Sequence, residues 1–253
     1  MRLGLVTHLW GAEWDLPSLL DNCRQSGFEG VELRTSHKHG VELGLSSAER
    51  DAVASRFAES GVTLVGFGTT CEFHSSDAAE VERNIEEGKR WIELAHDCGA
   101  GGIKVRPNGL PADVPVGKTL EQIGRAMRVL AEHGEGFGVE IRLEIHGKRT
   151  SELPNIKRIM DVADHPYAKV CWNSNETDLA GKGLEHNFNL VRDRLGTIHI
   201  HDLTTDYPWR PLFTLLNDAN FEGWTLLEDG DVPTDPVRVM KYYHLLWDEW
   251  TKA

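Results

Sequence analysis

The feature that most constrains the fold is a regular alternation of short β-rich segments with longer helical patterns. We identify β-rich segments at residues 2–9, 30–35, 62–68, 102–107, 139–147, 169–174, 197–202 and 223–229. Amphipathic stretches such as 46–60, 77–97, 119–133 and 235–250 lie between or after them, often with a glycine just past the end. Eight such units in 253 residues predict an α/β fold, a (β/α)8 TIM barrel whose right-handed crossovers make every strand parallel. A doubly wound open sheet is the alternative.

No linker rich in proline, glycine or serine and no change of composition divides the chain, so residues 1–253 are expected to form a single TIM-barrel domain. The amino-terminal segment is apolar for only a few residues, and it predicts a first strand and not a signal peptide. The four cysteines lie far apart without a CxxC pair, which predicts neither a disulfide framework nor a thiolate zinc site. These features favour a cytoplasmic protein.

Charge narrows the range of partners. Lysine and arginine number 27 against 40 aspartates and glutamates, a formal net charge of -13, which argues against binding to nucleic acid or to an anionic membrane. Neither a GxGxxG nor a GxxxxGK[ST] motif occurs, so nucleotide phosphates are not indicated. We expect a small-molecule substrate, and a homo-oligomer is possible.

The segment VEIRLEIHG, residues 139–147, alternates four apolar residues with Glu140, Arg142, Glu144 and His146. A barrel strand is covered on both sides, so the charged face should point into the barrel, at a cost of several kcal/mol unless these groups are paired or ligated. The same alternation turns further polar residues inward near the carboxyl ends of other strands: His8, Glu32, Arg34, Lys104, Arg106, Asn173, His199, His201 and Glu228. Catalytic groups of such barrels lie at that end.

Two glutamates, a histidine and an amide oxygen at one end of a barrel suit a divalent metal ion such as Mn2+, Co2+, Mg2+ or Zn2+. A bound cation would also compensate for the burial of the carboxylates. Other arrangements stay open. Glu144 could form an ion pair with Arg142 or Lys104, His199 could be a hydrogen-bonded core residue, and Glu228 could be a solvated loop residue.

Five short segments, GVEL, LEIHG, CWNSN, HIHD and LLED, occur in this order on the second, fifth, sixth, seventh and eighth predicted strands. Together they resemble the xylose isomerase-like TIM-barrel superfamily of sugar phosphate isomerases and epimerases. This superfamily includes D-tagatose 3-epimerase-like enzymes, inosose-processing enzymes and abasic-site endonucleases. The resemblance extends over essentially the whole chain. It implies one divalent metal ion held by Glu144, Asn173, His199 and Glu228, with Asp202 completing the HxxD pattern of His199.

The resemblance further implies an isomerase or epimerase of a sugar, sugar phosphate or related polyol. In such enzymes a metal-stabilised enediolate forms next to a carbonyl, and Glu144 and Glu228 would act as acid and base. Two alternatives are a metal-dependent lyase or dehydratase on a keto-sugar or inosose, and a non-catalytic sugar-binding barrel with a degraded metal site. Asn173 stands where relatives usually carry an aspartate, which should lower metal affinity.

Eight residues are candidate substrate contacts: His8, Arg34, Lys104, Arg106, His146, Glu176, His201 and Arg210. Lys104 and Arg106 suit a phosphate or carboxylate group, or an ion pair with the inward glutamates. Glu176 stands where relatives often carry a substrate-contacting histidine, and Arg210 follows the seventh strand, from where it could close over the substrate.

Overall fold

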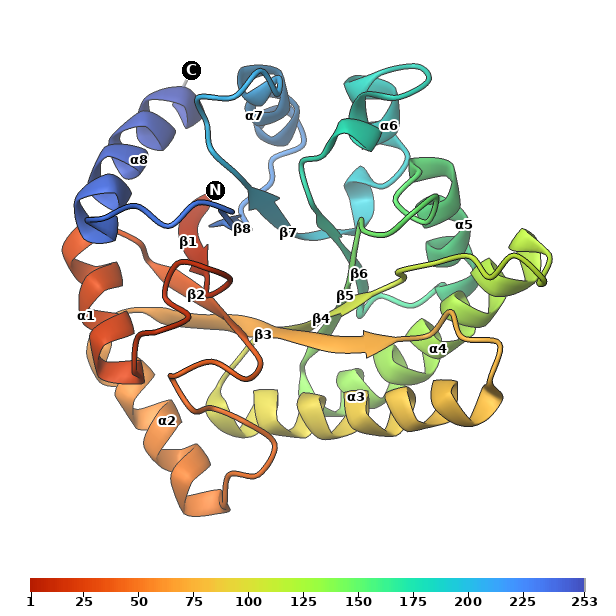
Figure 1. The fold of residues 1–253 in the computed structure, drawn as a ribbon, viewed down its shortest axis with the longest axis horizontal. Helices are drawn as coiled ribbons and strands as arrows, with labels where there is room; N and C mark the ends of the chain where they lie inside the picture. Colours follow the sequence, from red (N-terminus) through yellow and green to blue (C-terminus); the bar gives the residue numbers. More distant parts are fainter. Residues whose placement is uncertain (253) are drawn as a thin grey trace.

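In the computed structural model, which describes residues 1–252, eight parallel strands form a closed barrel with hydrogen bonds between consecutive strands and between β8 and β1 (Figure 1). The strands are β1 (Arg2–Val6), β2 (Gly30–Arg34), β3 (Thr63–Glu72), β4 (Gly102–Arg106), β5 (Glu140–Glu144), β6 (Ala168–Trp172), β7 (Leu195–Ile200) and β8 (Trp224–Leu227). The predicted (β/α)8 barrel is confirmed, and the open sheet is wrong.

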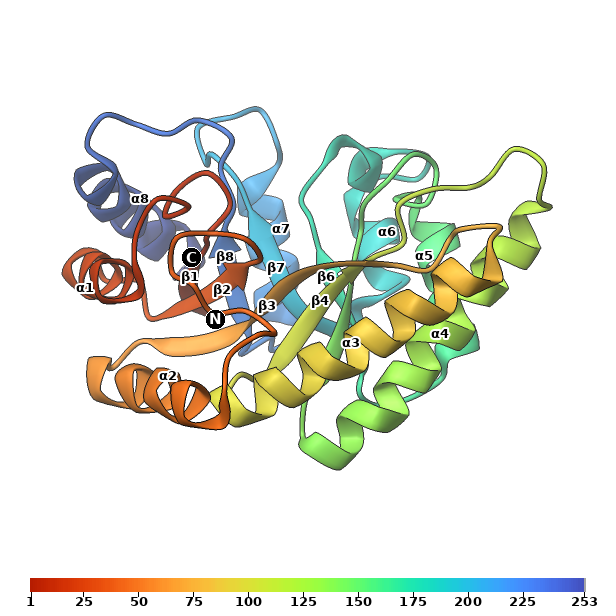
Figure 2. The same cartoon turned by 60° about the horizontal axis from the view of Figure 1, so that its bottom comes forward.

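Helices surround the barrel, and Figure 2 shows α3 and α4 side by side on its outer wall. The helices are α1 (Leu16–Ser26), α2 (Ser47–Ser60), α3 (Ala78–Cys98), α4 (Val116–Phe137), α5 (Leu153–Ala163), α6 (Leu184–Asn189), α7 (Trp209–Asp218) and α8 (Pro236–Thr251), with short 3-10 helices η1 (Glu176–Leu179) and η2 (Arg192–Arg194). Within residues 1–252, no helix has both the length and the apolar character that crossing a membrane requires.

Local signals explain where the predicted elements begin and end. Ser46 and Glu49 form a capping box at the start of α2, which fixes its first turn. Strand β3 continues to Glu72, beyond the predicted end at residue 68, and its register against β4 shifts after Gly68. The longer strand carries Glu72 to Arg106, whose guanidinium lies 2.9 Å from the Glu72 carboxylate.

The barrel has an apolar outer layer and a mixed interior. Trp172 of β6 points outward, as its place in the alternation predicts, and packs fully buried against Phe188 of α6 with ring centroids 5.8 Å apart. Inside, Val6, Val65 and Leu226 form a separate small apolar cluster. Arg142 lies toward the amino-terminal end of the barrel, where its guanidinium donates to the Val65 carbonyl oxygen and to Glu140.

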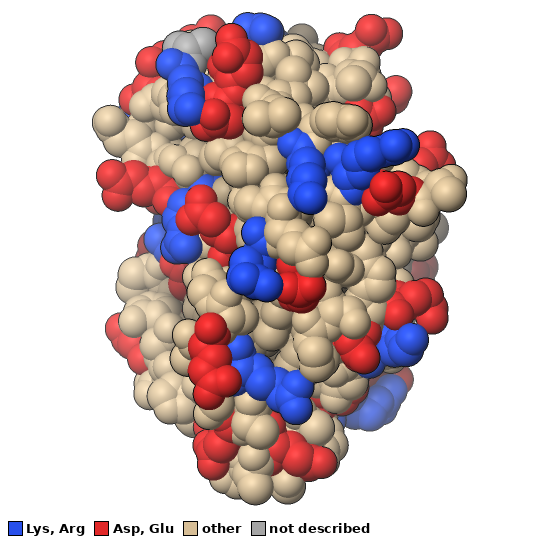
Figure 3. Space-filling view, turned by 90° about the vertical axis from the view of Figure 1, so that its left-hand side faces the viewer, with Lys and Arg blue, Asp and Glu red and all other residues tan. Residues whose placement is uncertain are grey.

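Charges on the outer surface are mixed. The face that carries α1, α2 and α8 shows acidic and basic side chains interspersed, without a continuous basic area (Figure 3). This face therefore presents nothing that resembles a phosphate-binding track.

The loop after β5 depends on Gly147, which has φ of 90° and approaches the loop after β4 closely. A Cβ atom there would lie 1.8 Å from the backbone oxygen of Asn108. We expect Gly147→Ala to lower the free energy of unfolding by at least about 2 kcal/mol, because both the backbone strain and the clash must be relieved.

Gly40→Ala is the matched control, since Gly40 has φ of 72° but its nearest neighbour would lie 4.0 Å from the new Cβ. Gly40→Ala should lower the free energy of unfolding by only about 1 kcal/mol. Urea unfolding of both variants measures the difference, and equal costs would show that the two loops do not approach as described.

Candidate metal centre and active site

A pocket of about 360 Å³ opens at the carboxyl ends of the strands. Its lining consists of His8, Arg34, Arg106, Glu144, His146, Asn173, His201, Glu228 and Gly230. Every lining residue except Gly230 is a candidate from the sequence. The volume is in the range of pockets that bind small metabolites.

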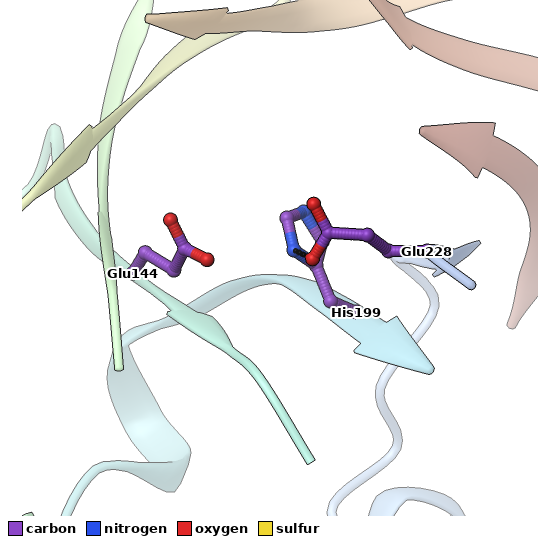
Figure 4. Close-up of side chains that lie close together, drawn as sticks. All are labelled: Glu144, His199 and Glu228. Atoms are coloured by element: carbon purple, nitrogen blue, oxygen red, sulfur yellow. Dashed lines mark hydrogen bonds and ion pairs between the residues drawn. The ribbon is translucent and has the colours of Figure 1, made fainter. Parts of the chain in front are cut away.

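Three potential metal ligands converge at this end of the barrel: Glu144 and Glu228 line the pocket, and His199 is buried beside them. One ligand atom each from Glu144 of β5, His199 of β7 and Glu228, which follows β8, lies within 4.8 Å of the others. Figure 4 shows Glu144 facing His199 and Glu228 across a gap. His199 Nδ1 lies 3.2 Å from Glu228 Oε2. Two roughly perpendicular ligands at about 2.1 Å from one ion lie about 3 Å apart, so this spacing fits a divalent cation.

Asn173 adds a side-chain oxygen atom that has no partner among residues 1–252. Its Oδ1 is buried and accepts no hydrogen bond within the described part of the chain, and its backbone oxygen lies 2.9 Å from His201 Nε2. An unsatisfied buried acceptor costs about 1–3 kcal/mol. A cation beside Asn173 would satisfy this oxygen, so the amide fits the place that the resemblance assigns to it.

Glu32 of β2 is a second carboxylate next to His199. It is fully buried, its Oε1 lies 3.3 Å from His199 Nε2, and neither oxygen has a hydrogen-bond partner among the described residues. A carboxylate behind a metal-ligating histidine orients the ring and selects its tautomer. The alternation in GVELR predicted that Glu32 faces inward but did not identify it as a site residue. Its distance from His199 becomes apparent only when the barrel closes.

Lys104 of β4 is buried beneath the pocket. Its side chain is 0% exposed, and its Nζ donates to Glu144 Oε2 at 2.6 Å. The ion pair considered for Glu144 is therefore present, with Lys104 and not with Arg142. Lys104 lies behind Glu144 and is not part of the pocket lining, so its position does not support the predicted direct contact with substrate. Gly68 leaves room beside it, since a Cβ there would lie 2.6 Å from Arg34 Cδ and 3.5 Å from Lys104 Cε.

Opposite charges keep the buried carboxylates ionised. Burial alone would raise the pKa of Glu144, but the charges of Lys104 and His199 lower it below its ordinary value. Burial likewise opposes ionisation of Glu228, whereas His199, Lys104 and Arg34 hold its pKa well below the usual range. Arg34 contributes through an ion pair of 3.1 Å with Glu228 Oε1.

The pKa of the His199 imidazole responds to the acidic groups around it. Burial lowers its pKa, but the neighbouring Cys171, Glu228 and Glu32 raise it well above the ordinary value. Metal ligation requires the neutral ring, so a bound cation would replace the ring proton as the positive charge among these carboxylates.

The structure places other sequence candidates away from the pocket floor. Arg210 is exposed on α7, with its guanidinium 4.8 Å from the ring centroid of Trp250, and Glu176 is exposed at the start of η1. Neither lines the pocket. His201 does, but both of its ring nitrogens lie against backbone oxygens, those of Asn173 and Glu228, so it links the ends of β6 and β8.

A polar network fixes the loops beside the pocket. Asp178 of η1 is fully buried, and its Oδ2 accepts hydrogen bonds from the Tyr207 hydroxyl at 2.9 Å and the Asn175 amide at 2.8 Å. Its Oδ1 has no partner among the described residues. Burial raises the pKa of Asp178 to about 7, although the Tyr207 and Asn175 hydrogen bonds oppose this shift.

This pKa predicts that stability falls with rising pH. Because the folded state holds the Asp178 proton more tightly than the unfolded chain, each pH unit between about 4 and 7 lowers the free energy of unfolding by up to about 1.4 kcal/mol. Asp178→Asn removes the titrating carboxyl group and therefore this part of the pH dependence. The variant should therefore gain about 2–3 kcal/mol relative to wild type between pH 5 and pH 8, measured by urea unfolding.

Asp193→Asn controls for the loss of one negative charge, because Asp193 is exposed. Its stability relative to wild type should change little between the two pH values. A parallel pH dependence of wild type and Asp178→Asn would contradict a raised pKa at this position.

The fold and the carboxylate-histidine floor of the pocket define an α/β barrel with a candidate metal centre. A family model described as xylose isomerase-like TIM barrel matches residues 20–242, and the chain belongs to this family. A comparison with curated proteins finds no significant match.

Solved structures share the fold over nearly the full length. D-psicose 3-epimerase from Clostridium cellulolyticum H10 is 14% identical, with a TM-score of 0.84 and 99% of each chain covered. A zinc-bound structure of the IolI protein is 14% identical, with a TM-score of 0.80 over 99% of this chain and 96% of that one. A probable 3-DHS dehydratase, AsbF from Bacillus anthracis, is 15% identical, with a TM-score of 0.77 over 98% of this chain and 99% of that one.

Proposed function

We propose that the protein is a divalent-metal-dependent isomerase or epimerase of a sugar, sugar phosphate or related polyol. The observation that carries this proposal is the convergence of Glu144, His199 and Glu228 at the floor of a sugar-sized pocket. Asn173 Oδ1 supports it as a buried oxygen to which no other described residue donates a hydrogen bond. The likeness to a D-psicose 3-epimerase and to a zinc-bound structure also supports it.

The proposed reaction begins with removal of a proton next to the substrate carbonyl. A divalent cation, when bound, supplies positive charge that stabilises the enediolate formed in this step. Glu144 lines the pocket as the proposed base, and the ion pair of Lys104 with its Oε2 fixes the direction of the carboxylate. Glu228 lies across the gap (Figure 4), and Arg34 holds its Oε1. Return of a proton to the opposite face of the same carbon inverts its configuration, which is epimerisation. Return of the proton to the neighbouring carbon isomerises the substrate.

A lyase or dehydratase is the second candidate, and the likeness to a probable 3-DHS dehydratase favours it. It would use the same proton abstraction and then expel a β-substituent instead of returning the proton. Product analysis by NMR in deuterated water separates the two reactions. Epimerisation incorporates deuterium at carbon without loss of water, whereas a dehydratase releases water and forms an unsaturated product.

We expect Glu144→Gln and Glu228→Gln each to reduce kcat by at least about 10³-fold, because each removes a proton-transferring group. The assay is a panel of ketoses and keto-polyols with added Mn2+, Co2+, Mg2+ or Zn2+, followed by deuterium incorporation into the product. Glu121→Gln is the control. It removes an exposed carboxylate on α4 and should retain wild-type turnover.

Full exchange activity in either glutamine variant would contradict the acid and base roles. Sugar binding without exchange in wild type, under every metal tested, would identify a binding barrel in place of an enzyme.

A further inference from the structure

Lys104 is a charged group inside the barrel that the proposed reaction does not use directly. Its side chain is completely buried between Gly68 of β3 and Glu144 of β5. A buried ammonium group is unfavourable unless it is paired, and its short ion pair with Glu144 Oε2 provides that pairing. Lys104 is therefore coupled to the candidate metal site through one carboxylate.

The protein's own cations already neutralise much of the site. Lys104 pairs with Glu144, Arg34 pairs with Glu228, and Glu32 faces His199. The fourth candidate ligand, Asn173, carries no charge. A divalent ion that enters this site would therefore meet carboxylates that already have positive partners, and Lys104 and Arg34 would repel it.

We propose that Lys104 is a positioning residue: it holds Glu144 by one oxygen, competes with the divalent metal ion for that carboxylate, and so keeps metal binding at the site weak. The proposal deepens the proposed function and rests on it. Because Lys104 occupies Oε2, Glu144 offers one oxygen to the pocket in a fixed direction. Glu144 is thereby prevented from chelating the ion with both oxygens.

The test measures Mn2+ affinity of the full chain by calorimetry and by the EPR signal of free Mn2+. Lys104→Met should bind Mn2+ at least about tenfold more tightly than wild type, since the competing cation is gone. Lys104→Gln keeps a hydrogen-bond donor without the charge and should also bind more tightly. Lys104→Gln is the variant to measure if Lys104→Met does not fold. Lys169→Gln removes the same charge from β6 outside the pocket lining and should stay within about twofold of wild type.

A second comparison isolates the contact with Glu144. In a Glu144→Gln background, Lys104→Met should raise Mn2+ affinity several-fold less than it does with Glu144 present, because the carboxylate through which Lys104 acts is gone and only its direct repulsion of the ion remains. A general structural effect of Lys104 would persist in full in that background and would overturn the proposal.

Other outcomes separate this proposal from the proposed function. If wild type binds Mn2+ and Lys104→Met binds it equally or less tightly, the role of Lys104 is wrong and the metal-dependent reaction stands. If only the Lys104 variants bind Mn2+, the competition is supported and the wild-type enzyme does not depend on metal. If none of the proteins binds Mn2+, both proposals fail.

Discussion

The organisation of the site depends on keeping three carboxylates ionised inside a closed barrel. Glu32, Glu144 and Glu228 lie around His199, where burial alone would favour their neutral forms. Lys104 and Arg34, from β4 and β2, supply the opposing charge. Each charge depends on its partners, because removing one partner of a buried pair leaves the other uncompensated, at a cost of about 3–5 kcal/mol. The network thus holds side chains from four strands and from the segment after β8 in one arrangement.

The closed barrel makes this arrangement possible because strands distant in sequence end at the same pocket. Glu144 and Glu228 are separated along the chain by β6, β7, β8 and the helices between these strands, yet they face each other across a gap (Figure 4). Gly68 contributes by having no side chain, which leaves room for Arg34 and Lys104 on either side of β3. A site of this kind is preorganised, since secondary structure and ion pairs fix its groups before a ligand arrives.

The sequence was sufficient to predict the barrel and the inward direction of its polar residues. Strict alternation in VEIRLEIHG and TIHIHD follows from strand geometry, so Glu144 and His199 had to share the interior once the barrel closed. The distances between these side chains, and the depth at which each is buried, were not predictable in this way. The sequence could not show that Lys104 lies behind Glu144, or that Glu32 contacts His199, because both depend on the register between strands. Arg210 and Glu176 belong to segments after the strands, whose paths single-sequence patterns do not determine.

The central claim is that Glu144, Asn173, His199 and Glu228 hold one divalent cation at the floor of the pocket. The most direct measurement is anomalous X-ray diffraction from crystals of the wild-type protein grown with Mn2+. The account predicts one strong anomalous peak between these four side chains, about 2.0–2.4 Å from their ligand atoms. No peak at this position, with the Lys104–Glu144 pair intact and Mn2+ bound only at surface carboxylates, would contradict it.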